Sequence, residues 1–396
     1  MIFHSLRTVS FRNLTDAEVY TGERNVFLVG ENGQGKTNFL EALYFAAYGS
    51  SFRGNRDGEL ARNGEKDYAV QATIAPQCGE GLDSYRSELK IKYEKGKKTV
   101  LLDGKRVEDR RELLSVVPCI IFCHEDMEFV AGSPERRRWF FDQSLSLCDS
   151  LYLDDLRNYR QVLKSRNAVL REAAMARRPP PPGILDALDP QFARYGLKLM
   201  EQREQAITLF SDLFGPLFRE VSGIPGIEVR YLPSWKFRDA GAPWLAERRD
   251  ADAAAGLSLS GPHRDRYGFY RGSAEFAGKA STGQRRLLAL LLRIAQARRF
   301  SQVTGKNPVL LLDDVLLEMD GEKRRRFLEL MPAYDQAFYT FLPEEPYRRY
   351  ARREPPAGGV PGGSAPSAGE KTLVYRVDSG KLDSEGGMTP ADRRDA

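Results

Sequence analysis

Apolar positions in the first third of the chain predict strands interrupted by one helix. Residues 1–30 favour short strands that end in the apolar run NVFLVG. The segment TNFLEALYFAAYG predicts a helix, and its apolar positions at helical spacing include Phe39, Leu40, Leu43 and Ala47. The two patterns together indicate a strand, a loop at ENGQGKT and a helix.

Between residues 68 and 120 the pattern predicts strands and hairpins. Apolar and charged side chains alternate in LKIKYE, which places Leu89, Ile91 and Tyr93 on one face and Lys90 and Lys92 on the other. The segment EKGKK and the later pair Asp103-Gly104 are typical of hairpin turns. We therefore expect a small antiparallel sheet with one solvated face.

Residues 134–220 have helical periodicity that is broken once. Four consecutive prolines at 179–182 cannot continue a helix, so they separate two long helices. The segment does not sustain the long heptad pattern of a coiled-coil arm. We expect a helical lobe that lacks such an arm.

The last third returns to mixed structure. Strand-like pieces occur near 226–232 and 266–276, a helix is predicted at 284–299, and PVLLLDD predicts a buried strand. After residue 353 the segment EPPAGGVPGGSAPSAG has the composition of a flexible linker, and the strand-like TLVYRVDSG follows it. The chain contains no internal repeat.

Composition narrows the class of protein. A chain of 396 residues suggests two or three domains, and 41% hydrophobic with 29% charged residues excludes a disordered or membrane chain. The N-terminus lacks an apolar signal core, so we expect a soluble cytoplasmic protein. Lys and Arg number 60 against 55 Asp and Glu, a net charge of +5. Any binding of nucleic acid must therefore be local or conditional.

The cysteines carry no evident chemistry. Four cysteines and three histidines form neither a disulfide framework nor the paired spacing of a zinc site. Cys119 and Cys123 lie in the apolar run VVPCIIFC, which favours small buried thiols in a reducing compartment.

The loop after the first predicted strand matches the pattern GxxxxGK[ST], a phosphate-binding loop. Its glycines let backbone N–H groups converge on phosphates, Lys36 neutralises the β- and γ-phosphate charge, and the Thr37 hydroxyl binds Mg²⁺. This strand, loop and helix order makes an ordinary glycine-rich connection improbable. The predicted ATP-contacting residues are Gly30, Glu31, Asn32, Gly33, Gln34, Gly35, Lys36 and Thr37.

A P-loop of this type needs a carboxylate at the end of a second buried strand. The run PVLLLDD supplies Asp313 on the magnesium side, and Asp314 stands where a general base would orient the attacking water. Taken alone, an apolar strand that ends in two aspartates is more often a solvated turn. Together with the P-loop, it predicts Lys36, Asp313 and Asp314 as catalytic residues, and Thr37 and Asp313 as magnesium ligands.

A third motif, Ala280-Ser281-Thr282-Gly283-Gln284, precedes a predicted helix. Ser and Gly at a helix N-terminus favour an anion, but the chain already has its own phosphate loop. We therefore expect Ser281, Gly283 and Gln284 to contact a nucleotide bound to another copy of the chain. Without the other two motifs, a simple N-cap would be the favoured interpretation of this segment.

The order of these three motifs resembles the ABC-type ATPase heads and, within them, the RecF family of bacterial recombination and replication-repair ATPases, which is related to chromosome-maintenance proteins. The resemblance spans about residues 1 to 345. The segments that carry it are FRNL (11–14), GENGQGKTNFLEAL (30–43), GSPERRRWFFD (132–142), YRQVLKSRN (159–167), GPHRD (261–265), STGQRR (281–286) and LLLDDVLLEMD, which ends at Asp320.

The resemblance implies an α/β fold, an ABC-type ATPase head (P-loop NTPase) with an inserted helical lobe and an antiparallel β subdomain. The parts that it implies are ATPase lobe I at 1–120, helical lobe II at 121–225, the C-terminal ATPase part with signature and Walker B at 226–353, and a flexible linker and tail at 354–396. Three departures concern Thr282, the shorter GSPERRRWFFD segment and the tail.

The resemblance also implies the activity. Such heads dimerise around two ATP molecules, with Ser281 and Gly283 of one subunit at the γ-phosphate held by Lys36 of the other, and Asp320 as the D-loop acid. RecF-like proteins bind single-stranded or gapped duplex DNA in an ATP-dependent way and hydrolyse ATP slowly. They work with RecR and RecO to load recombinase in recombinational repair and at replication forks.

Several residues keep two interpretations. The hairpin between Arg86 and Arg106 carries eight positive and three negative residues, which suits phosphate contact but also suits a protected edge strand. Its candidate DNA-binding residues are Lys90, Lys92, Lys95, Lys97, Lys98 and Lys105. A second set could contact phosphate or DNA or could have structural roles: His263, Arg264, Arg136, Arg137 and Arg138. A third set could border the nucleotide: Phe11, Arg12 and Asn13.

Two other functions fit part of the sequence. A P-loop phosphotransferase or another non-DNA ABC-type ATPase would also contain the P-loop, but a phosphotransferase would need no Ser281–Gln284 signature. A transporter subunit normally has a shorter separation between Lys36 and Asp313. The segment FCHED at 122–126 occupies the region of a Q-loop without supplying its glutamine.

Overall fold

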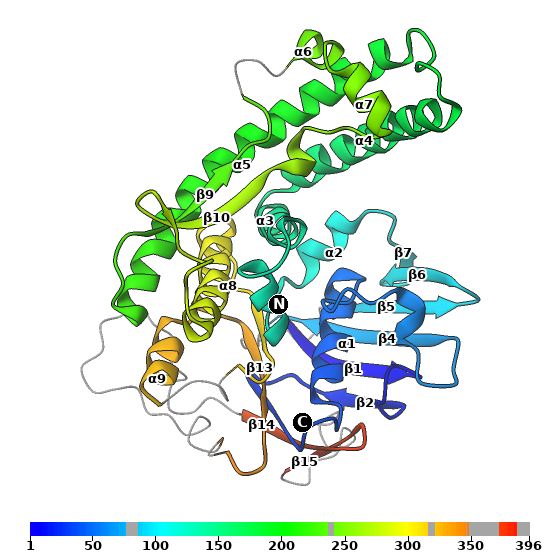
Figure 1. Cartoon of the computed structure of the whole chain (residues 1–396). Helices are drawn as coiled ribbons and strands as arrows, with labels where there is room; N and C mark the ends of the chain where they lie inside the picture. The colour runs from blue at the N-terminus through cyan, green and yellow to red at the C-terminus, as the bar shows by residue number, and fades with distance from the viewer. Residues whose placement is uncertain (77–85, 237–240, 316–320, 346, 348–371, 386–396) are drawn as a thin grey trace. The chain divides into compact units, whose positions relative to one another are not determined.

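The chain folds into two compact units. The computed structural model describes residues 1–76, 86–236, 241–315, 321–345, 347 and 372–385, and the structural statements below concern these residues. The first unit combines Met1–Asp126 with the chain from Phe300 onward, and the second comprises Met127–Arg299. Figure 1 shows the helices and strands of both units.

The first unit contains a six-stranded antiparallel sheet in the order β2-β1-β4-β5-β6-β7. The strands are β1 (Ile2–Val9), β2 (Ala17–Tyr20), β4 (Tyr68–Ala75), β5 (Ser87–Glu94), β6 (Lys97–Leu102) and β7 (Lys105–Arg106). The predicted alternation in β5 is confirmed, because Leu89 and Ile91 are buried while Lys90 and Lys92 lie on the other face. The Asp103-Gly104 turn joins β6 to β7, as its sequence predicts.

A second sheet in this unit has the order β15-β14-β3-β13-β12-β8, and all its pairs are parallel except β14 with β15. Its strands are β3 (Asn25–Val29), β8 (Cys119–Phe122), β12 (Val309–Leu312), β13 (Gln336–Phe341), β14 (Thr372–Asp378) and β15 (Lys381–Ser384). The inner strands are apolar along almost their whole length, as strands covered on both faces are. Strands β3, β8, β12 and β13 are buried throughout, whereas burial alternates along β14.

Helix α1 (Lys36–Tyr48) contacts strands of both sheets, and Figure 1 shows it beside β1, β4 and β5. It packs on β4 and β5 of the antiparallel sheet and on β8 and β13 of the parallel one. Because it is covered on all sides, nearly every residue of α1 is buried, including Lys36 and Glu41. Shorter elements of the unit are η1 (Asp57–Leu60), α2 (Arg110–Val116) and α9 (Gly321–Leu330).

The C-terminal strand differs from the expected free tail. TLVYRVD forms β14, which lies parallel to β3 with Leu373 opposite Val26 and Tyr375 opposite Leu28. Alternating burial of Leu373, Tyr375 and Val377 explains why this strand joins the sheet. The tail prediction for 354–396 is therefore corrected for residues 372–385, while the predicted linker lies outside the described residues.

The second unit is built on three helices, α3 (Pro134–Cys148), α4 (Ser150–Ala176) and α5 (Ile184–Ser222). The junction between the units is η2 (His124–Phe129). The proline tract at 179–182 lies between α4 and α5, which confirms the predicted break. Buried residues of all three helices meet in one core, which includes Leu145, Tyr159, Phe192 and Trp235.

The second unit also contains a three-stranded sheet of β9 (Ile227–Leu232), β10 (Arg266–Arg271) and β11 (Ala274–Glu275). Its remaining elements are α6 (Ala242–Ala246), α7 (Arg249–Ala255), η3 (Pro262–Arg264) and α8 (Thr282–Thr304). Strand β9 packs on α5, and Val229 N–H donates a hydrogen bond of 2.9 Å to Ser211 Oγ. The second unit continues to Arg299, beyond the boundary expected at residue 225.

Across the described residues, no helix is both long and apolar enough to cross a membrane.

Candidate nucleotide site

The P-loop connects buried strand β3 to the first turn of α1. Gly35 occupies the position before α1 with φ of 117°, a conformation that residues with a Cβ rarely adopt. The backbone can therefore turn sharply and direct its N–H groups toward the start of the helix, where an anion is favoured. This is the local geometry that the GxxxxGK[ST] pattern predicts.

Lys36 lies inside this loop. It is 4% exposed, and its ammonium donates hydrogen bonds to the carbonyl oxygens of Gly30 (2.6 Å) and Glu31 (3.0 Å). Among the described residues, both hydrogen bonds of this buried ammonium go to neutral carbonyl oxygens, which do not neutralise its charge. The site therefore carries positive charge that favours a phosphate.

Thr37 and Asp313 come together although they are far apart in the sequence. The Thr37 hydroxyl donates a hydrogen bond of 2.8 Å to Asp313 Oδ1. Asp313 follows β12, and its N–H donates to the carbonyl oxygen of Phe122 on β8 at 2.9 Å. Strand pairing thus fixes the carboxylate beside the first turn of α1. A hydroxyl and a carboxylate form the hard-oxygen pair that suits Mg²⁺.

The electrostatics of Asp313 follow from this position. Burial, with a smaller contribution from the neighbouring Asp314 charge, raises the pKa of Asp313 to about 7, while the Thr37 hydrogen bond opposes the shift. Asp314 is half-buried. Its backbone φ is 51°, a left-handed conformation that Asp adopts more readily than most residues with a Cβ. Asp314 thus turns away from the line of β12, whereas Asp313 remains beside Thr37.

Thr340 is a site residue that the sequence analysis missed. It is buried in β13, accepts a hydrogen bond from Asp314 N–H (2.7 Å), and its hydroxyl lies 2.8 Å from Asp314 Oδ1. It also lies 3.4 Å from Asp313 Oδ1. The only sequence signal is a polar residue in the otherwise largely apolar strand QAFYTF. Thr340 therefore holds the carboxylate for which a base role is predicted.

The FRN segment at 11–13 borders the loop through one residue. Asn13 donates from Nδ2 to the Gly33 carbonyl oxygen at 3.3 Å and accepts from Asn38 at 2.8 Å. Arg12 instead forms hydrogen bonds to buried Glu41 at 2.9 and 3.0 Å, and Phe11 is fully buried. Phe11 and Arg12 thus have structural contacts, whereas Asn13 reaches the P-loop.

The signature segment lies in the second unit. Ser281 N–H donates to Gln284 Oε1 (2.9 Å) and Gln284 N–H donates to Ser281 Oγ (3.3 Å), so the two form a reciprocal capping box at the start of α8. Ser281 and Gly283 are exposed, and a Cβ added at Gly283 would meet open space. The N-cap interpretation is thus correct for the isolated chain, while the exposed face of this turn stays available. Asp320 lies outside the described residues.

Comparison with known proteins decides the family. Residues 2–346 match the model of the RecF/RecN/SMC N terminal domain. The chain is 42% identical over 381 residues to the DNA replication and repair protein RecF of Treponema pallidum (strain Nichols), which covers 95% of this chain and 99% of that protein. The chain belongs to the RecF family.

Other relatives agree with this assignment. The DNA replication and repair protein RecF of Moorella thermoacetica is 33% identical, with 79% of this chain and 82% of that protein covered. A solved structure of the recombination mediator protein RecF with ATP has a TM-score of 0.79 at 24% identity, covering 97% of this chain and 99% of that one. An Smc head has a TM-score of 0.51 at 16% identity, with 100% and 99% covered. The predicted ATPase-head fold is confirmed.

The RecF-family chain also presents a cationic sheet face. Strand pairing places one residue of each of five neighbouring strands in a single row across the antiparallel sheet. In order from β1 to β7, the row is Arg7, Gln71, Lys90, Leu101 and Arg106. Lys92 lies two residues after Lys90 and pairs with Thr99, and Lys97 pairs with Glu94. Both lysines therefore lie on the same face as Lys90. Arg7 is exposed and comes from a strand far away in sequence, so the hairpin pattern did not indicate it.

The other candidate lysines have different surroundings. Lys98 lies on the opposite face, where its ammonium contacts the Asp57 carboxylate (2.7 Å) and the Gly49 carbonyl oxygen (2.7 Å). Lys98 is therefore removed from the predicted DNA-binding set. Lys95 lies in the β5–β6 turn, and Lys105 is exposed on β7.

The segments GPHRD and GSPERRRWFFD have both structural and exposed members. The imidazole of His263 lies 2.7 Å from the Tyr159 hydroxyl, and Arg138 donates to the Asp265 carbonyl oxygen at 2.7 Å. Arg137 donates to the carbonyl oxygens of Val130 and Tyr267. The exposed basic residues of the two segments, by contrast, are Arg136 and Arg264.

Proposed function

We propose that the chain is an ATP-dependent DNA-binding clamp of the RecF type. It binds single-stranded or gapped duplex DNA as an ATP-induced homodimer, and acts in recombinational repair and replication-fork maintenance by helping to load recombinase. The observation that supports this most directly is the 2.8 Å hydrogen bond from Thr37 to Asp313, because it joins the P-loop to the buried carboxylate that such an ATPase requires.

The nucleotide site would bind ATP through its P-loop. Gly30 to Thr37 would surround the phosphates, and Lys36 would leave its loop carbonyls for the β- and γ-phosphate oxygens. Thr37 and Asp313 would hold Mg²⁺, which when bound neutralises phosphate charge. Asp314, positioned by Thr340, would orient the attacking water. Hydrolysis would be slow and would reset the clamp.

Dimerisation would complete the site. Ser281, Gly283 and Gln284 of one protomer would contact the γ-phosphate held by Lys36 of its partner, with the positive end of α8 directed at the phosphate. The exposure of Ser281 and Gly283 supports this role, because nothing on their own unit covers them. ATP would thus switch assembly, since it supplies contacts that only two protomers complete.

DNA would contact the cationic sheet face. Its members Arg7, Lys90, Lys92 and Arg106 share one surface with Lys97, and exposed Lys95 and Lys105 lie close by in sequence. Such a face suits phosphates rather than bases, so binding would be independent of sequence and steeply dependent on salt. Dimerisation would double the number of such faces.

Further partners follow from family membership. We propose RecR and RecO as the partners with which the chain loads recombinase at gaps. Because its proposed substrate is chromosomal DNA, we propose that it acts in the cytoplasm. A solved relative is described as a recombination mediator in the RecFOR pathway.

The experiment measures self-association and affinity for gapped DNA with and without a non-hydrolysable ATP analogue. Sedimentation velocity reports the dimer and fluorescence anisotropy reports DNA binding. Neither Lys36→Met nor Ser281→Arg should form the ATP-dependent dimer. Lys36→Met should fail because it no longer binds ATP, whereas Ser281→Arg should still bind ATP as a monomer. Lys306→Met, an exposed lysine outside the site, is the matched control. Dimerisation and DNA affinity that ignore the nucleotide in the wild-type chain would refute the clamp.

A further inference from the structure

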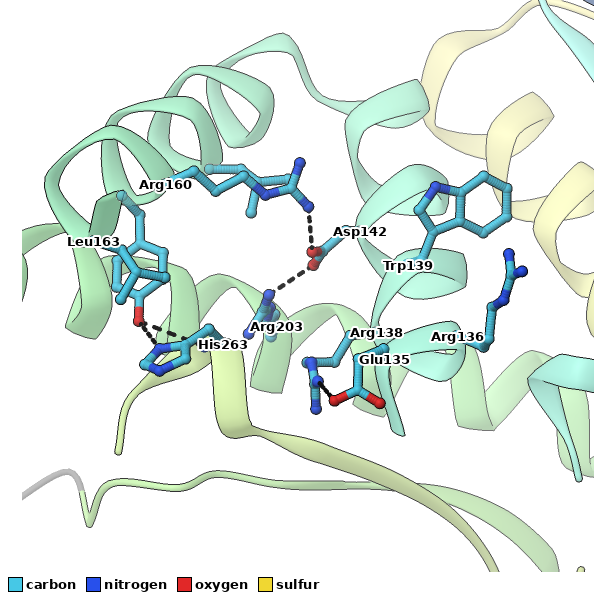
Figure 2. A pocket seen from close by; sticks show the side chains of 11 residues that line it. Glu135, Arg136, Arg138, Trp139, Asp142, Arg160, Leu163, Arg203 and His263 are labelled. Atoms are coloured by element: carbon cyan, nitrogen blue, oxygen red, sulfur yellow. Dashed lines mark hydrogen bonds and ion pairs between the residues drawn. The ribbon is translucent and has the colours of Figure 1, made fainter. Parts of the chain in front are cut away.

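Three segments that the nucleotide site does not use converge on one pocket in the second unit (Figure 2). They are 132–142, 159–167 and 261–265, which belong to α3, α4 and the loop around η3. The pocket has a volume of about 440 Å³, enough for a large planar group and its substituents. Its lining residues are Glu135, Arg136, Arg138, Trp139, Asp142, Leu156, Tyr159, Arg160, Leu163, Arg203 and His263.

The floor of the pocket is a fixed ionic network. Arg203 is 2% exposed and donates to Asp142 Oδ1 (2.7 Å), to Asp265 Oδ2 (2.8 Å) and to the Pro262 carbonyl oxygen (2.8 Å). Desolvation lowers the pKa of Arg203, but the Asp142 charge and the surrounding tyrosines outweigh it, so the pKa of Arg203 lies above its usual value. A network with this many satisfied partners is rigid, so it holds the pocket open in a defined shape.

The rim of the pocket differs from its floor because its charges face solvent. Arg160 is 59% exposed and is held only by a 3.3 Å contact to Asp142, which Arg203 already neutralises. Arg136 is exposed on α3. The four lining arginines stand against Glu135, Asp142 and the Asp265 carboxylate that Arg203 also binds, an excess of one positive charge, and the exposed cations are Arg136 and Arg160. The rim therefore favours an anion.

Trp139 provides an aromatic surface at the same rim. Its indole is 36% exposed, and one face stacks on Phe129 with ring centroids 5.7 Å apart and planes inclined by 26°. Figure 2 shows Trp139 and Arg136 on one side of the pocket and Arg160 and Leu163 on the other. Because Phe129 stacks on one face of the indole and fixes its orientation, a second flat ring can stack on the other face.

The cationic surface continues along α4 beyond the pocket. Arg160, Lys164 and Arg171 follow one another at spacings of four and seven residues, so they lie along one stripe of the helix, and Lys164 and Arg171 are exposed. At a rise of about 1.5 Å per residue, the stripe extends about 16 Å. A row of cations that leads away from an aromatic pocket matches a polymer with repeated negative charges and flat rings.

We propose that this pocket binds an unstacked nucleotide of single-stranded DNA. The base lies on Trp139, its flanking phosphates contact Arg136 and Arg160, and the following phosphates run along Lys164 and Arg171. The proposal rests on the proposed function, because it assumes that DNA is a ligand of the chain. It adds a contact that lies within one unit and needs neither ATP nor a second protomer. Single-strand binding by aromatic platforms and cationic grooves follows the same physics.

The first test measures the affinity of the full chain for fluorescent dT12 by anisotropy at several salt concentrations. Trp139→Leu should weaken binding five-fold or more, whereas Trp139→Phe should recover most of the loss because it retains a flat ring. Arg160→Ala and Lys164→Ala should each weaken binding two- to ten-fold and lower the salt slope by nearly one phosphate contact. Arg219→Ala, an exposed arginine on α5, is the matched control. Thermal unfolding confirms that each variant is folded.

The second test locates the base. A dT12 strand with one 5-iodouracil should crosslink to Trp139 on irradiation, and mass spectrometry of the digest identifies the residue. Crosslinking only outside the pocket, or equal affinity of Trp139→Leu and the wild-type chain, would overturn the proposal. A third result would also overturn it. If an acidic peptide displaced dT12, and Trp139→Leu and Trp139→Phe lost the same affinity for dT12, the pocket would recognise a protein.

The two proposals fail in different ways. The pocket contact should survive Lys36→Met, because that residue lies in the other unit and binds ATP rather than DNA. If Lys36→Met binds dT12 like the wild-type chain but gapped DNA binding ignores ATP, the clamp fails and the pocket stands. If gapped DNA binding depends on ATP while dT12 neither binds nor crosslinks at Trp139, the pocket fails and the clamp stands.

Discussion

The backbone N–H of Gly380 donates a hydrogen bond of 2.8 Å to the carbonyl oxygen of Gln34, so the C-terminal hairpin is attached to the P-loop. Ser379 N–H adds a bond of 2.7 Å to Gln34 Oε1, and Gly380 in turn accepts one from Thr15 N–H at 2.9 Å. The end of the chain thus holds a loop that must keep its shape around phosphates. Residues after the linker therefore contact the loop for which phosphate binding is proposed.

Gly380→Ala should weaken ATP binding ten-fold or more. An added Cβ would lie 1.8 Å from the Asn13 carbonyl oxygen, so the turn must move and release Gln34. Isothermal titration with ATP measures the effect. Gly305→Ala is the matched control, since Gly305 also has positive φ but its Cβ would meet open space, and it should leave ATP affinity unchanged. Equal affinities for the two variants would contradict the proposed attachment.

Thr340→Val should slow ATP hydrolysis by about ten-fold or more while leaving ATP affinity within two-fold of the wild type. Valine has the same shape but leaves Asp314 N–H and its carboxylate without the hydroxyl that now fixes them. Single-turnover hydrolysis separates this effect from nucleotide binding. Thr340→Ser should restore the rate because it retains the hydroxyl, and a slow Ser variant would assign the effect to packing.

The stability of the second unit should fall as the pH falls from 6.5 toward 4. Burial, together with the charges of Arg264 and Arg138, lowers the pKa of His263 to about 4 although the Ser258 carbonyl oxygen and Asp252 oppose the shift. Because the unfolded chain takes up a proton near pH 6.5 and the folded chain only near pH 4, acid favours unfolding across that window by up to about 3 kcal/mol. Above pH 6.5 this contribution is fully present.

Denaturant unfolding between pH 7.5 and 4.5 measures this dependence. His263→Gln cannot take up the proton, so its loss of stability across the window should be smaller than that of the wild-type chain, whatever its stability at pH 7.5. Exposed His124 lies outside the second unit, and His124→Gln should keep the wild-type dependence. Parallel curves for His263→Gln and the wild type would show that other groups cause the acid sensitivity.

Contiguous motifs made much of the nucleotide site predictable. Lys36 and Thr37 are fixed by one loop between a strand and a helix, and Asp313 ends a strand whose apolar run is visible in the sequence. Thr340 could not be predicted, because its place beside Asp314 depends on the register between β12 and β13. A single threonine in a strand has no spacing signature.

The same reason explains the C-terminal strand and the lysine hairpin. Alternation in TLVYRVD predicts a strand, but not that its partner is β3 at the other end of the chain. Alternation in LKIKYE correctly separates Lys90 from Ile91, yet the face of Lys98 depends on the turn that pairs it with Tyr93. Strand pairing and its register, rather than the alternation within one segment, decide these positions.

Lys90 and Lys98 should therefore respond differently to substitution. Lys90→Ala should weaken binding of gapped DNA two- to five-fold and lower its salt slope by nearly one contact, with unchanged thermal stability, because it lies on the outward face beside Arg7 and Arg106. Lys98→Met should instead lower stability by about 1 kcal/mol, since it leaves the Asp57 carboxylate and the Gly49 carbonyl oxygen without their shared ammonium. Anisotropy across salt concentrations and denaturant unfolding separate the two effects. If Lys98→Met changed the salt slope and Lys90→Ala did not, DNA would lie on the other face of the sheet.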